Sequence, residues 1–184
     1  MDAAFKTVKS SKLTISELML PSHSNFSGKI HGGYILSLLD QIAFACASKF
    51  SGYYCVTASV DTVDFLNPIE IGELVTMKAS INYVGKSSMI VGIRVEAENI
   101  RTGKVKHCNS SYFTMVAKTE KGENGSVPGL VLSSNEEIRR FYKAIKQIAQ
   151  KKERNLHEEK FDHLSEKALA ALKNYNVRLE MNQP

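Results

Sequence analysis

The 184-residue sequence is long enough for one domain with an extension, and a body of about 120 residues can bury a hydrophobic core. Its hydrophobic fraction of 43% and charged fraction of 23% are those of an ordinary soluble globular protein. The net charge of +5 is spread along the chain, so the sequence lacks the strongly basic block typical of nucleic-acid-binding proteins.

No apolar run reaches the roughly 20 residues that a membrane span requires, and the first residues lack the apolar stretch of a secretory signal. We therefore expect a cytoplasmic protein with no nucleic-acid or membrane partner. Cys46, Cys55 and Cys108 lie in apolar or strand-like surroundings. Because they show neither CxxC nor Cys/His ligand spacing, they are predicted to be reduced core thiols, and no metal site is predicted.

In chain order, a polar leader precedes an alternating segment, residues 12–20, which is predicted to be the first strand. Turn residues follow, and residues 32–51 form a predicted helix that is apolar nearly all round, with Gly52 as its cap. Asp40 is the one carboxylate in this helix. An ionised carboxylate in apolar surroundings needs a partner. Such groups cluster at sites of acid, base or nucleophilic chemistry, although structural ion pairs produce them too.

Strand patterns follow over residues 56–66, 74–84, 88–99 and 105–117, with a predicted hairpin turn at residues 85–87. The first of these strands would place Asp61 and Asp64 on opposite faces. Long strands and short turns predict an antiparallel sheet with one buried face. Such a sheet, wrapped around the helix, leaves one flank open. A second copy of the chain can close that flank, so we expect a homodimer.

Residues 1–120 are thus one predicted domain, 121–133 a linker and 134–184 a helical C-terminal extension. Ser134 begins a capping box, and apolar residues then recur at helical spacing. They are Ile138, Phe141, Tyr142, Ile145, Ile148 and Ala149 in a first helix, and Phe161, Leu164, Ala168, Leu172 and Tyr175 in a second. The polar face mixes Lys with Glu, so we expect the extension to dock onto protein rather than lipid.

Asn25, His31-Gly32-Gly33, Asp40 and residues 63–73 (Val-Asp-Phe-Leu-Asn-Pro-Ile-Glu-Ile-Gly-Glu) together form a recognisable pattern. From about residue 11 to residue 117 the chain resembles the hotdog-fold acyl-CoA thioesterases, in particular the cytosolic acyl-CoA hydrolase branch. The resemblance implies an α+β hotdog fold, in which an antiparallel sheet wraps a long central helix. It also implies hydrolysis of fatty acyl-CoA to free fatty acid and coenzyme A, with no cofactor beyond the coenzyme A of the substrate.

The resemblance further implies that Asp40 is the catalytic acidic residue and Asn25 the second active-site side chain. The peptide N–H groups of Gly32 and Gly33 would polarise the thioester carbonyl. Family members are dimers, often assembled as trimers of dimers into hexamers, and bind coenzyme A at subunit boundaries. The turn carrying Lys86, Ser87 and Ser88 resembles the segment that lies near the nucleotide, and His31 is assigned to the substrate-binding wall.

Physical chemistry agrees with this assignment, because a helix N-terminus offers unpaired N–H groups and glycine permits close approach of a substrate. Gly32 and Asp40 are separated by about 12 Å of helical rise. One chain therefore cannot bring both to one carbonyl carbon. We expect Asp40 of one subunit to face Asn25 and the helix start of its neighbour, which gives two equivalent sites per dimer.

Each role has a structural alternative. The alternative for Asp40 is a carboxylate hydrogen-bonded for structure, and for Asn25 a loop cap. His31 is alternatively a helix-start residue or an acid–base group, and Lys86 to Ser88 are alternatively ordinary turn residues. Whether Asp40 attacks the thioester or deprotonates water is open. Two other functions are open as well: a hotdog hydroxyacyl-thioester dehydratase, and a non-catalytic acyl-CoA sensor.

Overall fold

The computed structural model describes residues 4–61, 63–159 and 162–178. The chain divides into two compact units, residues 1–145 and 146–184. Phe161, which was assigned to the second helix of the extension, and residues 179–184 lie outside the described part. In the described residues, no helix combines the length and the apolar character needed to cross a bilayer.

Five antiparallel strands form the main sheet in the order β2-β4-β5-β6-β3. Their bounds are Leu13–Leu18 for β2, Tyr54–Val60 for β3, Glu73–Val84 for β4, Ser88–Asn99 for β5 and Lys104–Lys118 for β6. The predicted hairpin between β4 and β5 is confirmed, since the Gly85 N–H donates to the Ser88 carbonyl at 2.7 Å. β2 and β3 are the two edges of the sheet.

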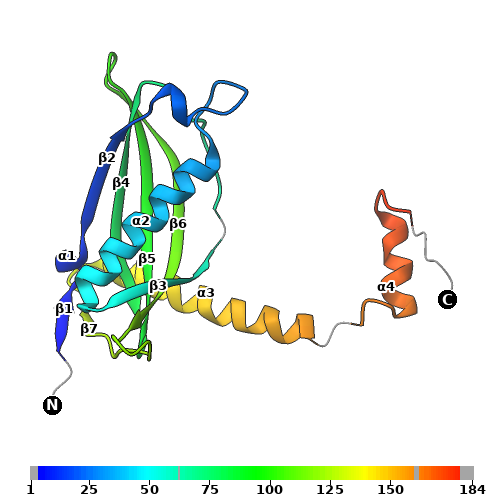
Figure 1. Ribbon diagram of the computed structural model, residues 1–184. Helices are drawn as coiled ribbons and strands as arrows, with labels where there is room; N and C mark the ends of the chain where they lie inside the picture. The colour runs from blue at the N-terminus through cyan, green and yellow to red at the C-terminus, as the bar shows by residue number, and fades with distance from the viewer. Residues whose placement is uncertain (1–3, 62, 160–161, 179–184) are drawn as a thin grey trace. The chain divides into compact units, whose positions relative to one another are not determined.

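The predicted long helix is α2, Gly32–Ser51, which crosses one face of the curled sheet (Figure 1). It ends at Gly52, whose φ of +79° and N–H bond to the Ser48 carbonyl confirm the predicted cap. Leu39, Ile42 and Cys46 are fully buried on the face that meets the sheet. The sheet supplies the other half of this core through the inward side chains of β4, β5 and β6 (Val75, Met77, Ile81, Met89, Val91, Val95, Phe113 and Met115).

In the single chain, α2 keeps the open flank that is expected when one sheet wraps around one helix. One stripe along the helix is exposed, formed by Leu36, Ser37, Asp40, Gln41 and Phe44. The physical reason is geometric: a sheet of five strands covers one side of a helix and leaves the opposite flank open. Asp40 lies on that open flank rather than in the interior.

The chain also forms a small second sheet that the sequence did not indicate. In the polar leader, β1 (Phe5–Thr7) is followed by a short helix, α1 (Val8–Ser11). β1 pairs in parallel with β7 (Gly129–Val131), which lies inside the segment predicted as a linker. Strands of three residues are too short to show alternation, and their pairing joins distant parts of the chain.

The strand predicted over residues 56–66 ends at Val60, so Asp61 and Asp64 do not share a strand. Beyond β3 the chain is held to β6 by isolated hydrogen bonds rather than by a continuous ladder. The Leu66 N–H donates to the Cys108 carbonyl, and the Asn109 amide donates to the Asp64 carbonyl, both at 2.9 Å. This segment returns Phe65 to the start of α2.

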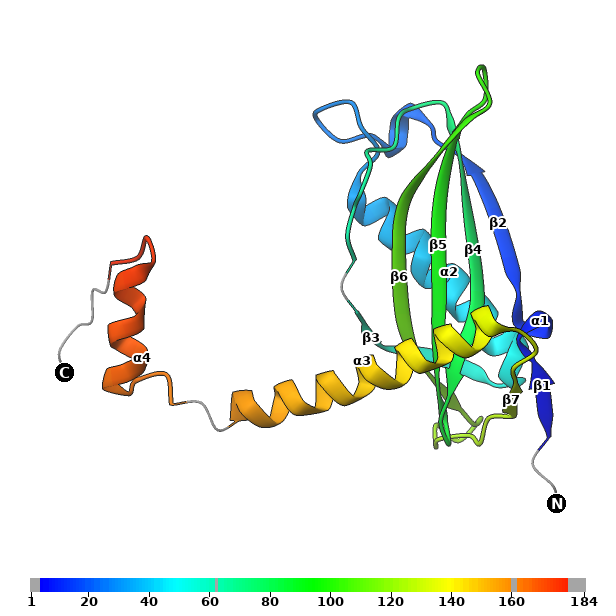
Figure 2. The same ribbon diagram turned by 180° about the vertical axis from the view of Figure 1, so that it is seen from behind.

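In the extension, α3 spans Asn135–Glu159 and starts as predicted, with the Glu137 N–H donating to the Ser134 hydroxyl. Its first turns lie on the face of the sheet opposite to α2 (Figure 2). There the rings of Phe141 and Tyr83 have centroids 5.3 Å apart. The second predicted helix is shorter than its apolar spacing indicated: α4 covers Glu166–Ala171 and continues into the 3-10 turn η2, Leu172–Asn174.

The three cysteines are free and buried, as predicted. Burial raises the pKa of the Cys46 thiol to about 12 and also raises the pKa of Cys108. Because the thiolate is the reactive form, the folded protein is expected to react slowly with an aromatic disulfide reagent. Unfolding in guanidinium should then release three equivalents, read by absorbance. Rapid stoichiometric reaction of the folded protein would contradict the buried placement.

Candidate active site

Asp40 has a specific hydrogen-bond partner on β3. The Thr57 hydroxyl donates to Asp40 Oδ1 at 2.5 Å. Thr57 also lies 3.4 Å from the Met115 sulfur, so its side chain is held between α2 and β6. With one oxygen fixed by Thr57, the Asp40 carboxylate has a defined orientation and its second oxygen is available to a ligand.

A hollow of about 560 Å³ opens beside this pair. Asp40 and Gln41 form its polar side, while Phe44, Tyr54 and Val56 form much of the rest. The rings of Phe44 and Tyr54 meet edge to face, with centroids 5.3 Å apart. A carboxylate thus stands in a depression that has one polar and one apolar side, which suits a reaction on a polar group attached to an apolar chain.

Asn25 lies in the loop that precedes α2, and its side chain organises that loop. Its Oδ1 accepts from the backbone N–H of Ser27 at 2.9 Å, from the Ser27 hydroxyl at 2.7 Å and from the Lys29 N–H at 3.2 Å. The loop-cap interpretation of Asn25 therefore holds for its carbonyl oxygen. The amide nitrogen of the same side chain is the group that can donate to a ligand, and the neighbouring Phe26 is fully exposed.

His31 caps α2: its Nδ1 accepts from the Gly33 N–H at 2.9 Å. The His31 carbonyl accepts from Tyr34 and Ile35. Within the described part of the chain, these bonds leave the Gly32 N–H as the donor of the first turn that a ligand can use. The Gly33 N–H becomes a donor to a ligand only if the His31 ring turns away. Both glycines were predicted as oxyanion donors, and the geometry favours Gly32.

Phe65 and Gly32 are in close contact. A Cβ built on Gly32 would stand 3.3 Å from the Phe65 ring, closer than most side-chain contacts. Glycine at this position therefore lets the returning segment pass over the start of α2. The half-exposed Phe65 ring in turn provides an apolar surface beside the Gly32 N–H.

Tyr34 fixes the first turn of α2 to the edge of the sheet. Its hydroxyl donates a short hydrogen bond to Glu17 of β2, and this bond raises the pKa of the tyrosine. The Tyr34 ring stacks on His23, with centroids 3.9 Å apart. The helix start, and with it the Gly32 N–H, is thereby held against both β2 and the preceding loop.

Lys86, Ser87 and Ser88 lie at the turn between β4 and β5. Since β4 runs antiparallel to β2, this turn is at the opposite end of the sheet from the start of α2 (Figure 1). The Ser87 carbonyl accepts from Ala117, and the Lys86 carbonyl accepts from Val127. One chain therefore brings together Asp40 and Thr57, and separately Asn25, His31 and the glycines, while Lys86 to Ser88 lie elsewhere.

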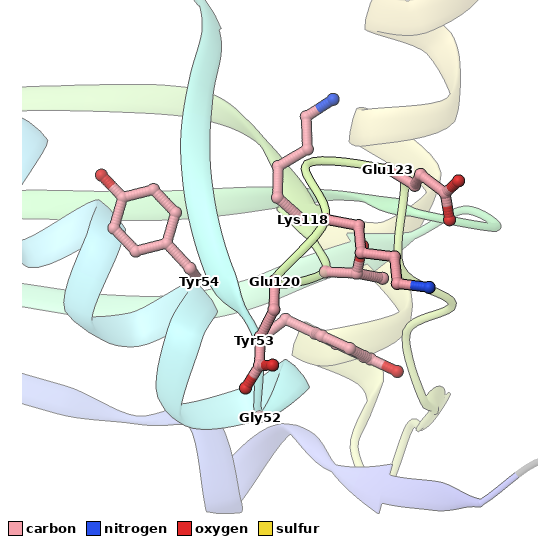
Figure 3. Close-up of a pocket in the computed structure, with 8 residues that line it drawn as sticks. Gly52, Tyr53, Tyr54, Lys118, Glu120 and Glu123 are labelled. Atoms are coloured by element: carbon pink, nitrogen blue, oxygen red, sulfur yellow. The ribbon is translucent and has the colours of Figure 1, made fainter.

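A larger hollow, of about 680 Å³, lies at the C-terminal end of α2 (Figure 3). Tyr53 and Tyr54 line it together with charged residues of both signs from Lys118 to Glu123. The Lys118 ammonium donates a hydrogen bond to Asn124 Oδ1 at 2.9 Å, and the Tyr53 ring packs against Gly125. Tyr54 lines this hollow and the Asp40 hollow, so the two are neighbours along β3. The carboxylate–hydroxyl pair makes the Asp40 hollow the better candidate for chemistry.

Comparisons with known proteins identify the family. Residues 27–104 match the family model described as "Thioesterase superfamily". The protein VdlD of Helicobacter pylori is 43% identical over 145 residues, which cover 79% of this chain and 83% of VdlD. The uncharacterized acyl-CoA thioester hydrolase YkhA of Bacillus subtilis is 33% identical, over 81% of this chain and 87% of YkhA. The chain belongs to the hotdog-fold acyl-CoA thioesterases.

Solved thioesterase structures share the fold. The crystal structure of an apo hexameric acyl-CoA thioesterase superposes with a TM-score of 0.80 and 32% identity, over 83% of this chain and 97% of that one. An acyl-CoA hydrolase of Staphylococcus aureus, solved with coenzyme A, gives a TM-score of 0.80 and 29% identity, over 86% and 95% of the two chains. The predicted hotdog fold and the predicted enzyme class, acyl-CoA thioester hydrolase, are confirmed.

Sequence reasoning missed one residue of this candidate site, Thr57. Threonine is common in strands, so its presence in β3 carried no signal by itself. Its place in the sequence could have indicated the role, because Thr57 lies in the strand that directly follows the helix with the carboxylate of Asp40.

Proposed function

We propose that this chain hydrolyses fatty acyl-CoA to free fatty acid and coenzyme A. The observation that carries the proposal is the Asp40–Thr57 pair in a hollow with an apolar side, on the open flank of α2. An acyl chain would occupy the apolar side of such a hollow, with its thioester beside the carboxylate. The names of the relatives support acyl-CoA as the substrate class.

In the proposed reaction, the oxygen of a water molecule forms a bond to the thioester carbonyl carbon, and the carbon–sulfur bond breaks. Asp40 either takes the water proton or attacks the carbonyl first and is then released by water. The thiolate of coenzyme A leaves and is protonated. Thr57 holds one oxygen of Asp40, so that the other faces the substrate.

We further propose that each site is shared between two subunits. The exposed stripe of α2 and the unpaired edge of β3 lie on one side of the chain, where a twofold-related copy would cover both. The amide of Asn25 and the Gly32 N–H of that copy would then reach the thioester next to Asp40. The Gly32 N–H would stabilise the oxygen that gains charge, and Gly33 would join only after the His31 ring turned.

Three solved structures of the S. aureus enzyme support this set of residues. They are alanine variants of an asparagine, an aspartate and a threonine, at positions separated by 15 and 17 residues. Asn25, Asp40 and Thr57 are separated by the same intervals. Coenzyme A complexes of that enzyme, and the hexameric relative, also support an oligomeric acyl-CoA hydrolase, which we expect here as a dimer or trimer of dimers.

Coenzyme A is expected to bind with its two ends at the β4–β5 turn and at the start of α2. Lys86, Ser87 and Ser88 would lie near the nucleotide portion, and His31 near the thioester end. The reaction needs no cofactor, because coenzyme A enters with the substrate and leaves with the product. A cytoplasmic location is supported by the human relative, named cytosolic acyl coenzyme A thioester hydrolase, which is 30% identical and of whose length the chain spans 36%.

The test is a thiol-release assay with purified protein and acyl-CoAs of short, medium and long chains. Saturable thiol release from at least one of them is expected. Binding of coenzyme A without release from any chain length would favour the sensor. Release that survives His31→Ala but is lost in Asp40→Asn would exclude the dehydratase dyad.

Thr57→Val should lower kcat/KM about 10- to 100-fold, because a hydrogen bond to a charged group is lost while the side-chain volume is kept. Thr57→Ser retains the hydroxyl and should stay near the wild-type rate, which makes it the matched control. The same thiol-release assay measures both. Equal rates for Thr57→Val and the wild type would remove Thr57 from the site.

A further inference from the structure

A separate hollow of about 170 Å³ lies on the outer face of the sheet, opposite the face that α2 covers. Strand alternation directs Lys78 and Arg94 to this outer face, and the first turns of α3 add Arg139 and Arg140. Four cationic side chains from three elements thus converge on one small depression, and no part of the proposed hydrolysis uses them.

The cations outnumber the carboxylates that pair with them. Lys78 and Arg94 both bond to Glu96, at 2.6 and 2.8 Å. Arg139 and Arg140 both bond to Glu136, at 2.6 and 2.8 Å. These contacts lower the pKa of each carboxyl to about 2, so both glutamates are ionised at neutral pH. Two positive charges therefore remain uncompensated around the hollow.

Several N–H donors at the hollow remain available to a ligand. The bonds of Arg94 and Arg140 to their glutamates use Nε, which leaves the terminal nitrogens of both guanidinium groups to bind an anion. Asn82 adds a neutral donor: its side chain is only 5% exposed, and its Oδ1 accepts from Ser80. The Asn82 amide nitrogen is therefore the polar atom with which this buried residue meets the hollow.

Gly92 makes room for that amide. A Cβ at position 92 would stand 2.1 Å from Asn82 Nδ2, so any other residue would displace the amide or close the floor of the hollow. The Asn82 amide therefore supplies an N–H donor at the bottom of the hollow, in space that Gly92 leaves free. Arginine and lysine side chains surround it. The hollow is small, has unpaired N–H donors and carries an excess of positive charge. These properties suit an anion with several acceptor oxygens.

We propose that this hollow binds a phosphate group. Its volume of about 170 Å³ leaves room for one phosphate group. The group is either free inorganic phosphate or the end of a larger phosphorylated molecule whose remainder lies outside the hollow. The site is on the opposite face of the sheet from Asp40 and is independent of the hydrolysis.

The test is isothermal titration of the full chain with inorganic phosphate, pyrophosphate and adenosine diphosphate at constant ionic strength. The site variant is Arg94→Gln with Arg139→Gln, which leaves Lys78 on Glu96 and Arg140 on Glu136. The control is Lys9→Gln with Arg101→Gln, two exposed positions elsewhere that give the same change of net charge. Circular dichroism checks that each variant is folded.

At least one ligand is expected to bind the wild type and the control with equal affinity, and the site variant about tenfold more weakly or worse. Binding of inorganic phosphate identifies the free ion as sufficient, whereas binding of the diphosphates alone identifies a carried phosphate group. Lack of saturable binding by all three, or equal binding by the site variant, overturns the proposal.

Two measurements keep the test decisive whatever the stability of the double variant. Arg94→Gln alone is the milder substitution and should still weaken binding. In the wild type, the backbone amide signals of Gly92 and Arg94 should shift during the titration, and unshifted signals would overturn the proposal. Lys86→Gln should bind the same ligand as tightly as the wild type, which separates this site from the proposed nucleotide end of the coenzyme A site.

Discussion

Asp40→Asn is expected to lower kcat for thioester hydrolysis by roughly 10²- to 10⁴-fold, the range for loss of a positioned acid–base group. Asparagine keeps the size of the side chain and can still accept from the Thr57 hydroxyl, but it neither takes a proton from water nor attacks a thioester. The thiol-release assay under saturating acyl-CoA measures the loss.

The matched control is Gln41→Ala, which removes the neighbouring polar side chain on the same exposed stripe of α2. It should retain most of the activity, since the uncharged Gln41 amide can act neither as a base nor as a nucleophile in the reaction. Thermal unfolding should report similar midpoints for both variants, because both positions are exposed in the single chain. An Asp40→Asn enzyme within a few-fold of wild type would refute the catalytic role.

Mixing two inactive variants should restore activity if the site is shared. In a heterodimer of Asp40→Asn and Asn25→Ala chains, one site carries both defects and the other carries neither. A statistical mixture of co-expressed chains should then show about a quarter of the wild-type activity, because half of the dimers hold one intact site of two. Thiol release by the co-expressed mixture, against each variant alone, measures the recovery.

The control for this experiment pairs Asp40→Asn with Thr57→Val. Asp40 and Thr57 are bonded within one chain, so every site of that heterodimer keeps one of the two defects. Its activity should not exceed that of Thr57→Val alone. If the first pair also shows no recovery although mixed dimers have formed, each site is complete within one chain and the shared arrangement is wrong.

Much of the fold was predictable from local pattern. The helix from Gly32 to Ser51 shows in its apolar run and its glycine cap, and the β4–β5 hairpin shows in alternation broken by a short polar turn. What failed depends on distant contacts. The pairing of β1 with β7 joins three-residue strands. In the described residues just past Val60, isolated hydrogen bonds to β6 replace the predicted ladder.

The candidate site was predictable to a different degree for each residue. Asp40 stands out because it is charged in an apolar helix. Its place on the open flank of α2 was not predictable, since apolar composition does not reveal which side of a helix one sheet covers. The role of Thr57 depends on the packing of β3 against α2, which no local signal encodes. The capping of Gly33 by His31 is one of the alternatives that the sequence left open for a histidine at a helix start, and the structure shows that cap.

The exposed edge of β3 has a consequence for a chain without its partner. Its outer row of amide and carbonyl groups would be open to pairing with any extended peptide, beside the apolar side chains of the uncovered helix flank. Assembly would therefore protect the protein from aggregation as well as complete its chemistry. Variants that associate more weakly should accumulate in the insoluble fraction of the cell, and this loss should be larger than the fall in the activity of the soluble protein.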